Sequence, residues 1–210
     1  MKNIYRNAFF QLTEFLENIE KEQGIKYCLV GGILVGLYSE IRSTTDIDFI
    51  VDIYSANFSI NNFIEILKEN NFYPIQDWNN TAMLAEGTQI LKYLDKQERV
   101  ILDNYIVVRN SADVYKKIGP IALERRVRIK LLGIECWATS KEDYILSKLV
   151  FGGWQDYADA LGCWLRFSET LNLDYLDKIC NDLGISKECK LLTSGIDDPD
   201  EYFEELRKIK

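Results

Sequence analysis

The order of apolar and polar residues predicts alternating helices and strands over the first part of the chain. Apolar residues recur at helical spacing from Ile4 to Glu20, and Gly24 then ends this opening helix. A short apolar run over 25–30 predicts a buried strand that leads into a double glycine and a helical turn. The segment 46–53 is apolar on both faces after its first residues, so we expect a strand in a sheet that is covered on both sides.

More strands are expected downstream of this segment. A helix is predicted over 62–71, and a polar turn over 77–80. Alternating and apolar runs then predict the strands of a meander over 81–87, 89–95 and 99–108. The stretch "RRVRIKLLGIECWAT" predicts a hairpin about Gly133.

From Ser140 onward the pattern is helical throughout. Ser140 and Asp143 form a capping-box pattern at the start of the first helix, and "WQDYADALGCWLRF", "LDYLDKICNDLG" and "DEYFEELRKIK" keep helical spacing. We therefore expect an α/β domain over 1–138, with a mixed sheet flanked by helices, and a C-terminal helical domain over 139–210. The chain has three prolines and no Gly/Ser-rich stretch, so no flexible linker is expected between them.

Composition narrows the chemistry that this chain can use. Its 210 residues are 47% hydrophobic, which is enough to build a real core, and the formal net charge of −8 argues against nonspecific binding of nucleic acid. An RNA substrate would need a local basic groove. Because the chain has no histidine, His-based general-base catalysis and the usual zinc sites are excluded. Catalysis must therefore use carboxylates, Lys, Tyr, Cys or a hard metal ion.

The cysteines and the N-terminus bear on where the protein resides. Five cysteines without CxxC spacing predict free, mostly buried thiols in a reducing compartment. The first twenty residues alternate charged and apolar side chains, so they predict neither a signal peptide nor a membrane span. We expect a cytoplasmic protein with no membrane partner.

Two aspartates at the start of the strand over 46–53 are the first candidate for chemistry. Asp46 and Asp48 lie two residues apart, so on a strand they project side by side from one face. Two such carboxylates repel each other, and an oxygen-preferring divalent ion such as Mg²⁺ relieves that repulsion. A solvated strand end is the structural alternative. An Asp-x-Asp pair is also found in sugar-nucleotide glycosyltransferases, so the pair alone does not choose a reaction.

A double glycine upstream is the second candidate. Gly31 and Gly32 lie between a buried strand and a helical segment, where backbone N–H groups can approach an anion closely. A simple tight turn is the alternative. About fourteen residues separate Gly32 from Asp46, which is room for a short helix and a return into a neighbouring strand. The anion-binding turn and the carboxylate pair would then share one edge of a sheet.

The stretch "VGGILVGLYSEIRSTTDIDFIV" resembles the nucleotidyltransferase signature of the DNA polymerase beta superfamily. The resemblance implies the nucleotidyltransferase fold, in which the two aspartates hold metal ions and a third carboxylate arrives from a later strand. On the phosphate side of the nucleotide it implies a group of residues that includes the glycine turn and the segment before the aspartates: Gly31, Gly32, Arg42, Thr44 and Thr45.

The third carboxylate has more than one candidate. Asp103 interrupts an otherwise apolar strand at the right point along the chain, although it could instead open a turn with Asn104. Asp95 is the rival position. Asp52 continues the parity of Asp46 and Asp48 but lies at the far end of the strand, where we expect a solvated terminus.

A second resemblance lies in the helical half. "SKEDYILSKLVFGGWQDYADAL" is similar to a segment of abortive-infection nucleotidyltransferase toxins, in which a helix carries a Lys and the next helix carries two Asp. Lys148, Asp156 and Asp159 match those positions, whereas Gln155 stands where a basic residue is common. The resemblance implies a catalytic role for Lys148 beside the nucleotide, a nucleotide contact for Asp156 and a possible antitoxin partner. The alternatives are a surface lysine and an aspartate placed by the helix dipole.

The expected function is transfer of a nucleoside monophosphate from an NTP to a hydroxyl acceptor, with release of pyrophosphate. Two Mg²⁺ ions, or Mn²⁺, would be held by Asp46, Asp48 and Asp103. Three classes of acceptor remain open: RNA, as in toxin-type enzymes; a small hydroxylated molecule such as an aminoglycoside or lincosamide antibiotic; and protein hydroxyls. A non-catalytic nucleotide-binding protein of the same fold is a further alternative, and a glycosyltransferase is the third.

Overall fold

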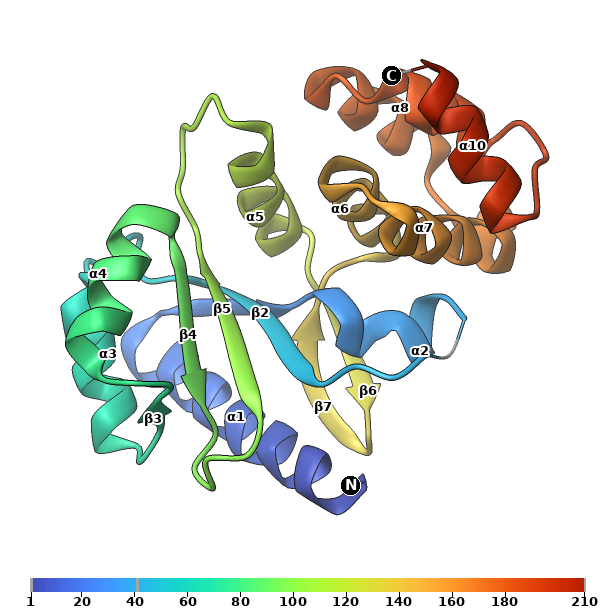
Figure 1. Ribbon diagram of the computed structural model, residues 1–210. Coiled ribbons are helices and arrows are strands. Elements are labelled where there is room, and N and C mark those ends of the chain that lie inside the picture. The colour runs from blue at the N-terminus through green and yellow to red at the C-terminus, as the bar shows by residue number, and fades with distance from the viewer. Residues whose placement is uncertain (1, 41, 210) are drawn as a thin grey trace.

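A mixed sheet of seven strands forms the centre of the computed structural model, which describes residues 2–40 and 42–209 (Figure 1). The strand order is β3-β4-β5-β2-β1-β7-β6. The strands are β1 (Lys26–Leu29), β2 (Asp46–Asp52), β3 (Tyr73–Pro74), β4 (Ile90–Leu94), β5 (Ile101–Ile106), β6 (Val127–Leu131) and β7 (Ile134–Ala138). The central strand β2 runs parallel to β5 and antiparallel to β1, so the sheet is mixed as expected.

Helices connect the strands of the sheet and make up the second part of the chain. In the first part of the chain they are α1 (Lys2–Gln23), the 3₁₀ turn η1 (Gly31–Leu34), α2 (Val35–Tyr38), α3 (Ile60–Glu69), α4 (Trp78–Thr88) and α5 (Val114–Glu124). In the second part they are α6 (Lys141–Phe151), α7 (Trp154–Phe167), η2 (Ser168–Thr170), α8 (Leu173–Leu183), α9 (Ser186–Leu192) and α10 (Pro199–Ile209). The described part of residues 139–210 is helical, as the sequence predicts.

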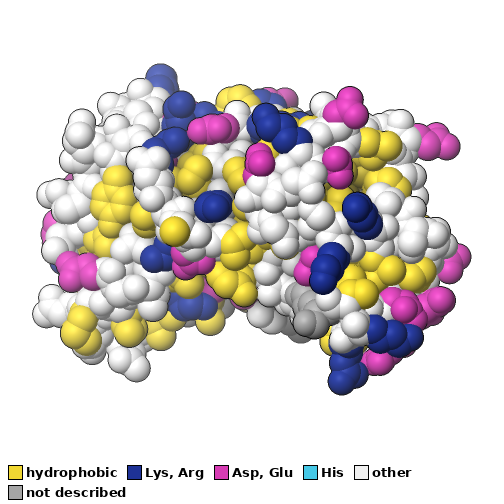
Figure 2. Space-filling view, turned by 90° about the horizontal axis from the view of Figure 1, so that it is seen from above, with side chains coloured by type: hydrophobic (Ala, Val, Ile, Leu, Met, Phe, Trp, Pro, Cys, Tyr) yellow, Lys and Arg dark blue, Asp and Glu magenta, His cyan; other side chains and the backbone are white. Residues whose placement is uncertain are grey.

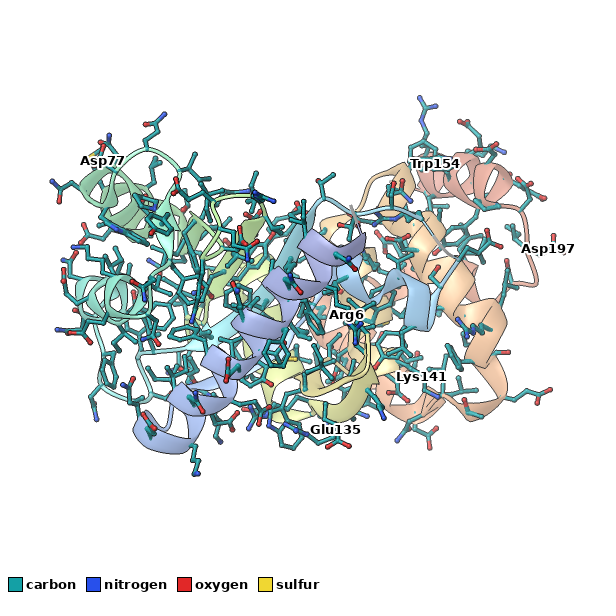
Figure 3. The ribbon with its side chains drawn as sticks, turned by 90° about the horizontal axis from the view of Figure 1, so that it is seen from below. Arg6, Asp77, Glu135, Lys141, Trp154 and Asp197 are labelled. Carbon is teal, nitrogen blue, oxygen red and sulfur yellow. The ribbon has the colours of Figure 1, made fainter. Side chains whose placement is uncertain are left out.

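The two faces of the sheet carry different helices. The opening helix α1 crosses the lower face, where it packs against β1 and β7, as the view from below shows (Figure 3). Its apolar positions, which the helical spacing identifies, are all buried: Phe9, Leu12, Phe15, Leu16 and Ile19. On the upper face α5 packs against β1 and α6 (Figure 1). The side chains of this upper face form the candidate site.

One buried apolar cluster extends through both halves of the chain. It includes Phe9 of α1, Phe49 of β2, Leu146 of α6 and Leu206 of α10. Burial of such side chains is the main favourable term in folding, so the helical half shares a core with the α/β half and is not merely tethered to it. The boundary at residue 138 stays a prediction.

The segment 77–88 differs from the expectation. A polar turn and a strand over 81–87 were expected, but the residues form the helix α4. Asp77 is its N-cap, since the carboxylate accepts a hydrogen bond from the backbone N–H of Asn80 at 2.8 Å. The helix buries Thr81 and Ala85 at a spacing of four residues and leaves Met83 exposed. The segment 77–80, which was expected to form a turn, is therefore the start of a helix.

The helix α5 has no counterpart in the sequence-based expectation. Pro120 lies inside it and Gly119 precedes the proline, and both residues weaken a helical pattern. Its cap is local, because Asp113 accepts a hydrogen bond from the backbone N–H of Tyr115 at 3.0 Å. Ile118 and Ala122 are buried one turn apart, so tertiary packing outweighs the poor helix propensity.

The hairpin and the cysteines agree with the expectation. The hairpin turns at Leu132 and Gly133 between the antiparallel strands β6 and β7. All five cysteines are free and buried. Within the described residues, none of the helices combines the length and the apolar composition needed to cross a bilayer.

Ser140 caps α6, the helix that carries Lys148, as the capping pattern predicts. Its hydroxyl oxygen accepts from the backbone N–H of Asp143 at 3.1 Å, and its O–H donates to the Asp143 carboxylate at 2.9 Å. We expect Ser140→Ala to lower the free energy of unfolding by about 1–2 kcal/mol, because a buried cap is lost. Urea denaturation measures this, with Ser43→Ala at an exposed loop position as the matched control. Equal stability of the two variants would contradict the role of the cap.

Candidate active site

Three carboxylates meet at the upper face of the sheet, where β2 lies beside β5. Parallel pairing places Asp48 directly opposite Asp103, and Asp46 lies two residues before Asp48 on the same face. One carboxylate oxygen from each of the three residues lies within 4.8 Å of the other two. Sheet register, and not sequence proximity, therefore brings Asp103 to the pair.

Asp103 rather than Asp95 completes this group. Asp95 lies in the turn after β4, where its Oδ1 accepts hydrogen bonds from the backbone N–H groups of Arg99 and Val100 at 2.6 and 2.8 Å. Its carboxylate is thus occupied by the turn that connects β4 to β5. Asp52, expected to be a solvated strand end, is instead buried and paired with Arg109 at 2.7 Å.

The glycine turn lies against Asp48 and donates a hydrogen bond to it. The backbone N–H of Gly32 donates to Asp48 Oδ2 at 3.2 Å, so in this structure that donor serves the carboxylate. Gly31 has φ of +67°, and a Cβ added there would lie 2.2 Å from the same Oδ2 atom. A Cβ on Gly32 would lie 2.7 Å from Thr44 Oγ1. The turn therefore requires glycine both for its backbone conformation and for its close approach to Asp48.

Asp46 has a hydroxyl partner from the preceding loop. Thr44 Oγ1 donates to Asp46 Oδ1 at 2.9 Å. Tyr5 of α1 donates its O–H to the backbone carbonyl of Asp46 at 2.8 Å, which fixes the start of β2 from the lower face. Thr45, which the resemblance places on the phosphate side, is exposed.

Burial raises the pKa of Asp48 to about 6. The negative charges of Asp46 and Asp103 act in the same direction, whereas the Gly32 N–H and the Lys148 ammonium favour the ionised form. The pKa of Tyr105, which lies two residues after Asp103, is also raised, by burial and by the charges of the three aspartates. The cluster is therefore a concentration of negative charge in a partly desolvated place.

The residues present fit a hard divalent cation. All three donors are carboxylates, the ligand type that Mg²⁺ and Mn²⁺ prefer, and Asp103 is 4% exposed. Asp103 Oδ1 is buried without a hydrogen-bond partner in the described structure. A buried carboxylate oxygen without a partner is costly, and a cation among the three carboxylates would satisfy it.

A network of alternating charges lies beside this cluster. Arg42 binds Asp159 of α7 through two hydrogen bonds of 3.1 and 2.8 Å. Lys148 of α6 is buried between Asp156 and Asp159, at 2.7 and 2.9 Å. Burial opposes ionisation of Asp159, yet the hydrogen bonds and charges of Arg42 and Lys148 bring its pKa below the ordinary value. Both candidate phosphate-binding cations are thus held by carboxylates.

A cavity of about 570 Å³, a volume within the range of small-molecule sites, lies beside these groups; Asp103 and Asp159 are not among the residues that line it. At one end its lining includes the glycine turn, Arg42, Thr44, Asp46, Asp48, Lys148 and Asp156. At the other end it is more apolar, with Ile50 of β2, Val107 directly after β5 and Ile118 of α5, although Asp113 and Lys116 also line the cavity. Tyr115 and Phe151 are exposed there, with ring centroids 5.7 Å apart. Charged and apolar substrate groups can therefore be held side by side.

Trp154 and Tyr157, two aromatic residues at the start of α7, are not among the residues that line the cavity. Trp154 donates from Nε1 to Asp200 Oδ1 of α10 at 2.7 Å, beside the C-terminal helices (Figure 3). Tyr157 is buried against Tyr202, with ring centroids 6.2 Å apart. Ordinary packing accounts for both residues.

Sequence reasoning missed the neighbours of Asp103. Lys92 lies directly opposite Asp103 on β4, and its Nζ is 2.5 Å from Asp103 Oδ2. The alternation of "ILKYL" marks Lys92 as the polar position of that strand, but the sequence does not reveal the strand that it faces. The cavity wall formed by α5 was missed together with that helix.

Comparison with known protein families decides the assignment. Residues 7–192 match the family described as "Nucleotidyltransferase of unknown function (DUF6036)". The chain belongs to this family. The match confirms the resemblance to the nucleotidyltransferase superfamily that the sequence motif indicates. Comparison with curated protein sequences gave no significant match.

Solved structures similar to this family member are also nucleotidyltransferase-like. An antigenic nucleotidyltransferase-like protein from Paracoccidioides brasiliensis is 16% identical, with a TM-score of 0.47, over 83% of this chain and 89% of that one. The lincomycin-bound lincosamide antibiotic adenylyltransferase LnuA is 17% identical, with a TM-score of 0.45, over 73% and 94%. The antibiotic-resistance factor ANT(2'')-Ia is 13% identical, with a TM-score of 0.39, over 99% and 94%. The family assignment therefore rests on the sequence match.

Gly31→Ala should damage both the fold and the site. A non-glycine residue at this positive φ costs about 1–2 kcal/mol, and the added Cβ would displace the Asp48 carboxylate. We expect a lower free energy of unfolding and loss of any stabilisation of this family member by Mg²⁺. Gly36→Ala is the matched control, because an added Cβ in α2 has nothing within 4 Å and favours the helix. Thermal unfolding measures both, and equal effects would contradict the proposed contact.

Asp48→Asn should stabilise the metal-free protein at pH 7. The pKa of Asp48 is raised above its ordinary value, so ionisation of Asp48 destabilises the native state. This cost grows as the pH rises from about 4 to about 6, and it is absent well below pH 4, where the carboxyl group is protonated in both the folded and the unfolded protein. The variant should gain about 2–3 kcal/mol at pH 7, and the gain should vanish as the pH falls to 4.

Chemical denaturation across this pH range measures the effect of Asp48→Asn. Glu135→Gln, at an exposed position on β7, should change nothing. A less stable Asp48→Asn protein at pH 7 would contradict the raised pKa of Asp48 in the native state.

Proposed function

We propose that this chain is a Mg²⁺-dependent nucleotidyltransferase that transfers a nucleoside monophosphate from an NTP to an acceptor hydroxyl and releases pyrophosphate. The observation that carries the proposal is the convergence of three carboxylates, a glycine turn and Lys148 beside one cavity. Titratable groups with perturbed pKa values beside a concave cavity mark a candidate active site. Membership of a nucleotidyltransferase family supports the same reaction class.

Asp46, Asp48 and Asp103 would hold the divalent ions. When bound, such ions neutralise charge on the transferring phosphoryl group and favour ionisation of the acceptor hydroxyl. Asp103 would also draw off the acceptor proton, a task that this histidine-free chain must give to a carboxylate or water. The turn at Gly31 and Gly32 would hold Asp48 in place beneath the nucleotide.

Lys148 would act as the cation on the phosphate side of the cavity. Asp156 and Asp159 hold its ammonium in one place, which removes the entropy cost of ordering a long side chain on binding. Arg42 would act mainly through Asp159, because both of its hydrogen bonds go to that carboxylate. Asp156 reduces the positive charge that Lys148 offers, so we propose that metal ions supply most of the charge that balances the triphosphate.

A small hydroxylated acceptor is the second candidate beside RNA. The apolar end of the cavity offers a surface for the carbon framework of such a molecule. On the face shown in Figure 2, basic side chains are interspersed with acidic and apolar ones and form no continuous basic surface there. Because RNA binding depends on phosphate contacts, this distribution and the net charge of −8 favour the small acceptor. The toxin-type resemblance, with its antitoxin partner, favours RNA.

Transfer of label from α-³²P-NTPs in the presence of Mg²⁺ tests the function. The acceptors are tRNA, a panel of aminoglycosides and lincosamides, and the protein itself. Asp103→Asn should reduce the transfer rate at least about 100-fold, because it removes a metal ligand and the proton acceptor. Asp95→Asn should retain the rate, since an amide oxygen can still accept the two backbone hydrogen bonds of its turn.

The labelled product identifies the acceptor class. Label in tRNA supports a toxin-like enzyme, and label in an antibiotic supports a resistance enzyme. If no acceptor is labelled and NTP binding does not depend on Mg²⁺, the chain is a non-catalytic nucleotide-binding protein. Equal loss of transfer in Asp95→Asn and Asp103→Asn would contradict the assignment of the third carboxylate.

A further inference from the structure

A lysine is bonded to the third carboxylate of the cluster. Lys92 Nζ lies 2.5 Å from Asp103 Oδ2, and the two residues face each other across the antiparallel pair of β4 and β5. Since Asp103 also faces Asp48 across the parallel pair of β5 and β2, the three side chains share the upper face of the sheet. The lysine therefore approaches the cluster from the side opposite to β2.

The two partners of this ion pair differ in their freedom to move. The Asp103 side chain is 5% exposed, whereas the Lys92 side chain is 53% exposed. Lys92 has no second ion pair in the part of the chain that the structure describes. The ammonium can therefore leave for solvent on its flexible stem at little cost, but the carboxylate cannot.

The two carboxylate oxygens of Asp103 have different surroundings. Oδ2 is taken by Lys92, while Oδ1 is buried without a hydrogen-bond partner. Three carboxylates and one ammonium carry a net charge of −2 when all four groups are ionised. One divalent cation balances this charge. A second divalent ion would face the ammonium at the same carboxylate, and like charges at such distances repel strongly.

We propose that Lys92 is a resident cation of the metal site, which restricts the nucleotide-free protein to one divalent ion by holding Asp103. The proposal rests on the proposed function, in that the cluster holds divalent ions. When a triphosphate binds, its negative charge favours a second ion, and Lys92 releases Asp103 to it. Lys92 is thus a positioning residue, because it acts through Asp103.

Titration of the nucleotide-free full chain with Mn²⁺, followed by electron paramagnetic resonance, tests this proposal. The wild-type protein should bind one ion. Lys92→Met should bind two ions, the first about tenfold more tightly, whereas Lys92→Arg, which keeps the charge, should bind one. Lys130→Met, at an exposed position of β6, is the matched control for net charge and should bind as the wild type does.

Two outcomes would overturn the proposal, and a third separates it from the proposed function. Binding of two ions by the wild-type protein would overturn it, and so would unchanged binding by Lys92→Met while Asp48→Asn loses the ion. Lys92 would then be only a cross-strand ion pair. If Asp48→Asn binds Mn²⁺ as the wild type does, the cluster is not the metal site, and the proposed function fails with it.

Discussion

Parallel pairing of β2 with β5 is the constraint on which the rest of this structure depends. It places Asp48 opposite Asp103, although 55 residues separate them along the chain, and it therefore creates the three-carboxylate cluster. Each pair of ionised carboxylates within 4.8 Å repels by roughly 3 kcal/mol at an effective dielectric constant of 20. A net hydrogen bond contributes about 1 kcal/mol, so the contacts from Gly32 and Thr44 cannot offset this repulsion alone. The arrangement therefore favours a nearby cation, or a proton on one carboxylate.

The surroundings of the cluster follow from that preference. Lys92 supplies one positive charge from the neighbouring strand, and Lys148 supplies another from α6. Gly31 contributes by lacking a side chain, because only a bare backbone can lie this close to Asp48. Even so, the pKa of Asp48 stays raised, so the residues of the protein leave part of the negative charge uncompensated. This residual charge is the physical reason for the proposal that the cluster binds a metal ion.

Features specified by local sequence were predictable, and features that depend on sheet pairing were not. The residues from Gly31 to Asp48 span one turn, one short helix and the start of one strand, so the motif could be recognised from the sequence alone. Asp103 was identified by its interruption of an apolar strand, but the choice over Asp95 needed the register of β5. Lys92 could not be assigned at all, because no local pattern reveals which strand β4 pairs with.

The errors in secondary structure have a similar cause. The residues of α4 include strong helix formers, yet the polar start at Asp77 resembles a turn as closely as a cap. The helix α5 contains a glycine followed by a proline, and packing against the sheet compensates for both. Because α5 forms one wall of the cavity, the missed helix also concealed the apolar end of the candidate site.

The network around Asp159 makes the two halves of the chain interdependent. Asp159 lies on α7 and is 3% exposed, so its charge needs both Arg42, from the loop before β2, and Lys148, from α6. Removing one partner from such a group leaves an uncompensated buried charge, which costs far more than a surface ion pair contributes. Because Lys148 also favours ionisation of Asp48, the position of α6 affects the charge of the carboxylate cluster. The helical half is therefore part of the electrostatics of the site, beyond its role as a cover for the sheet.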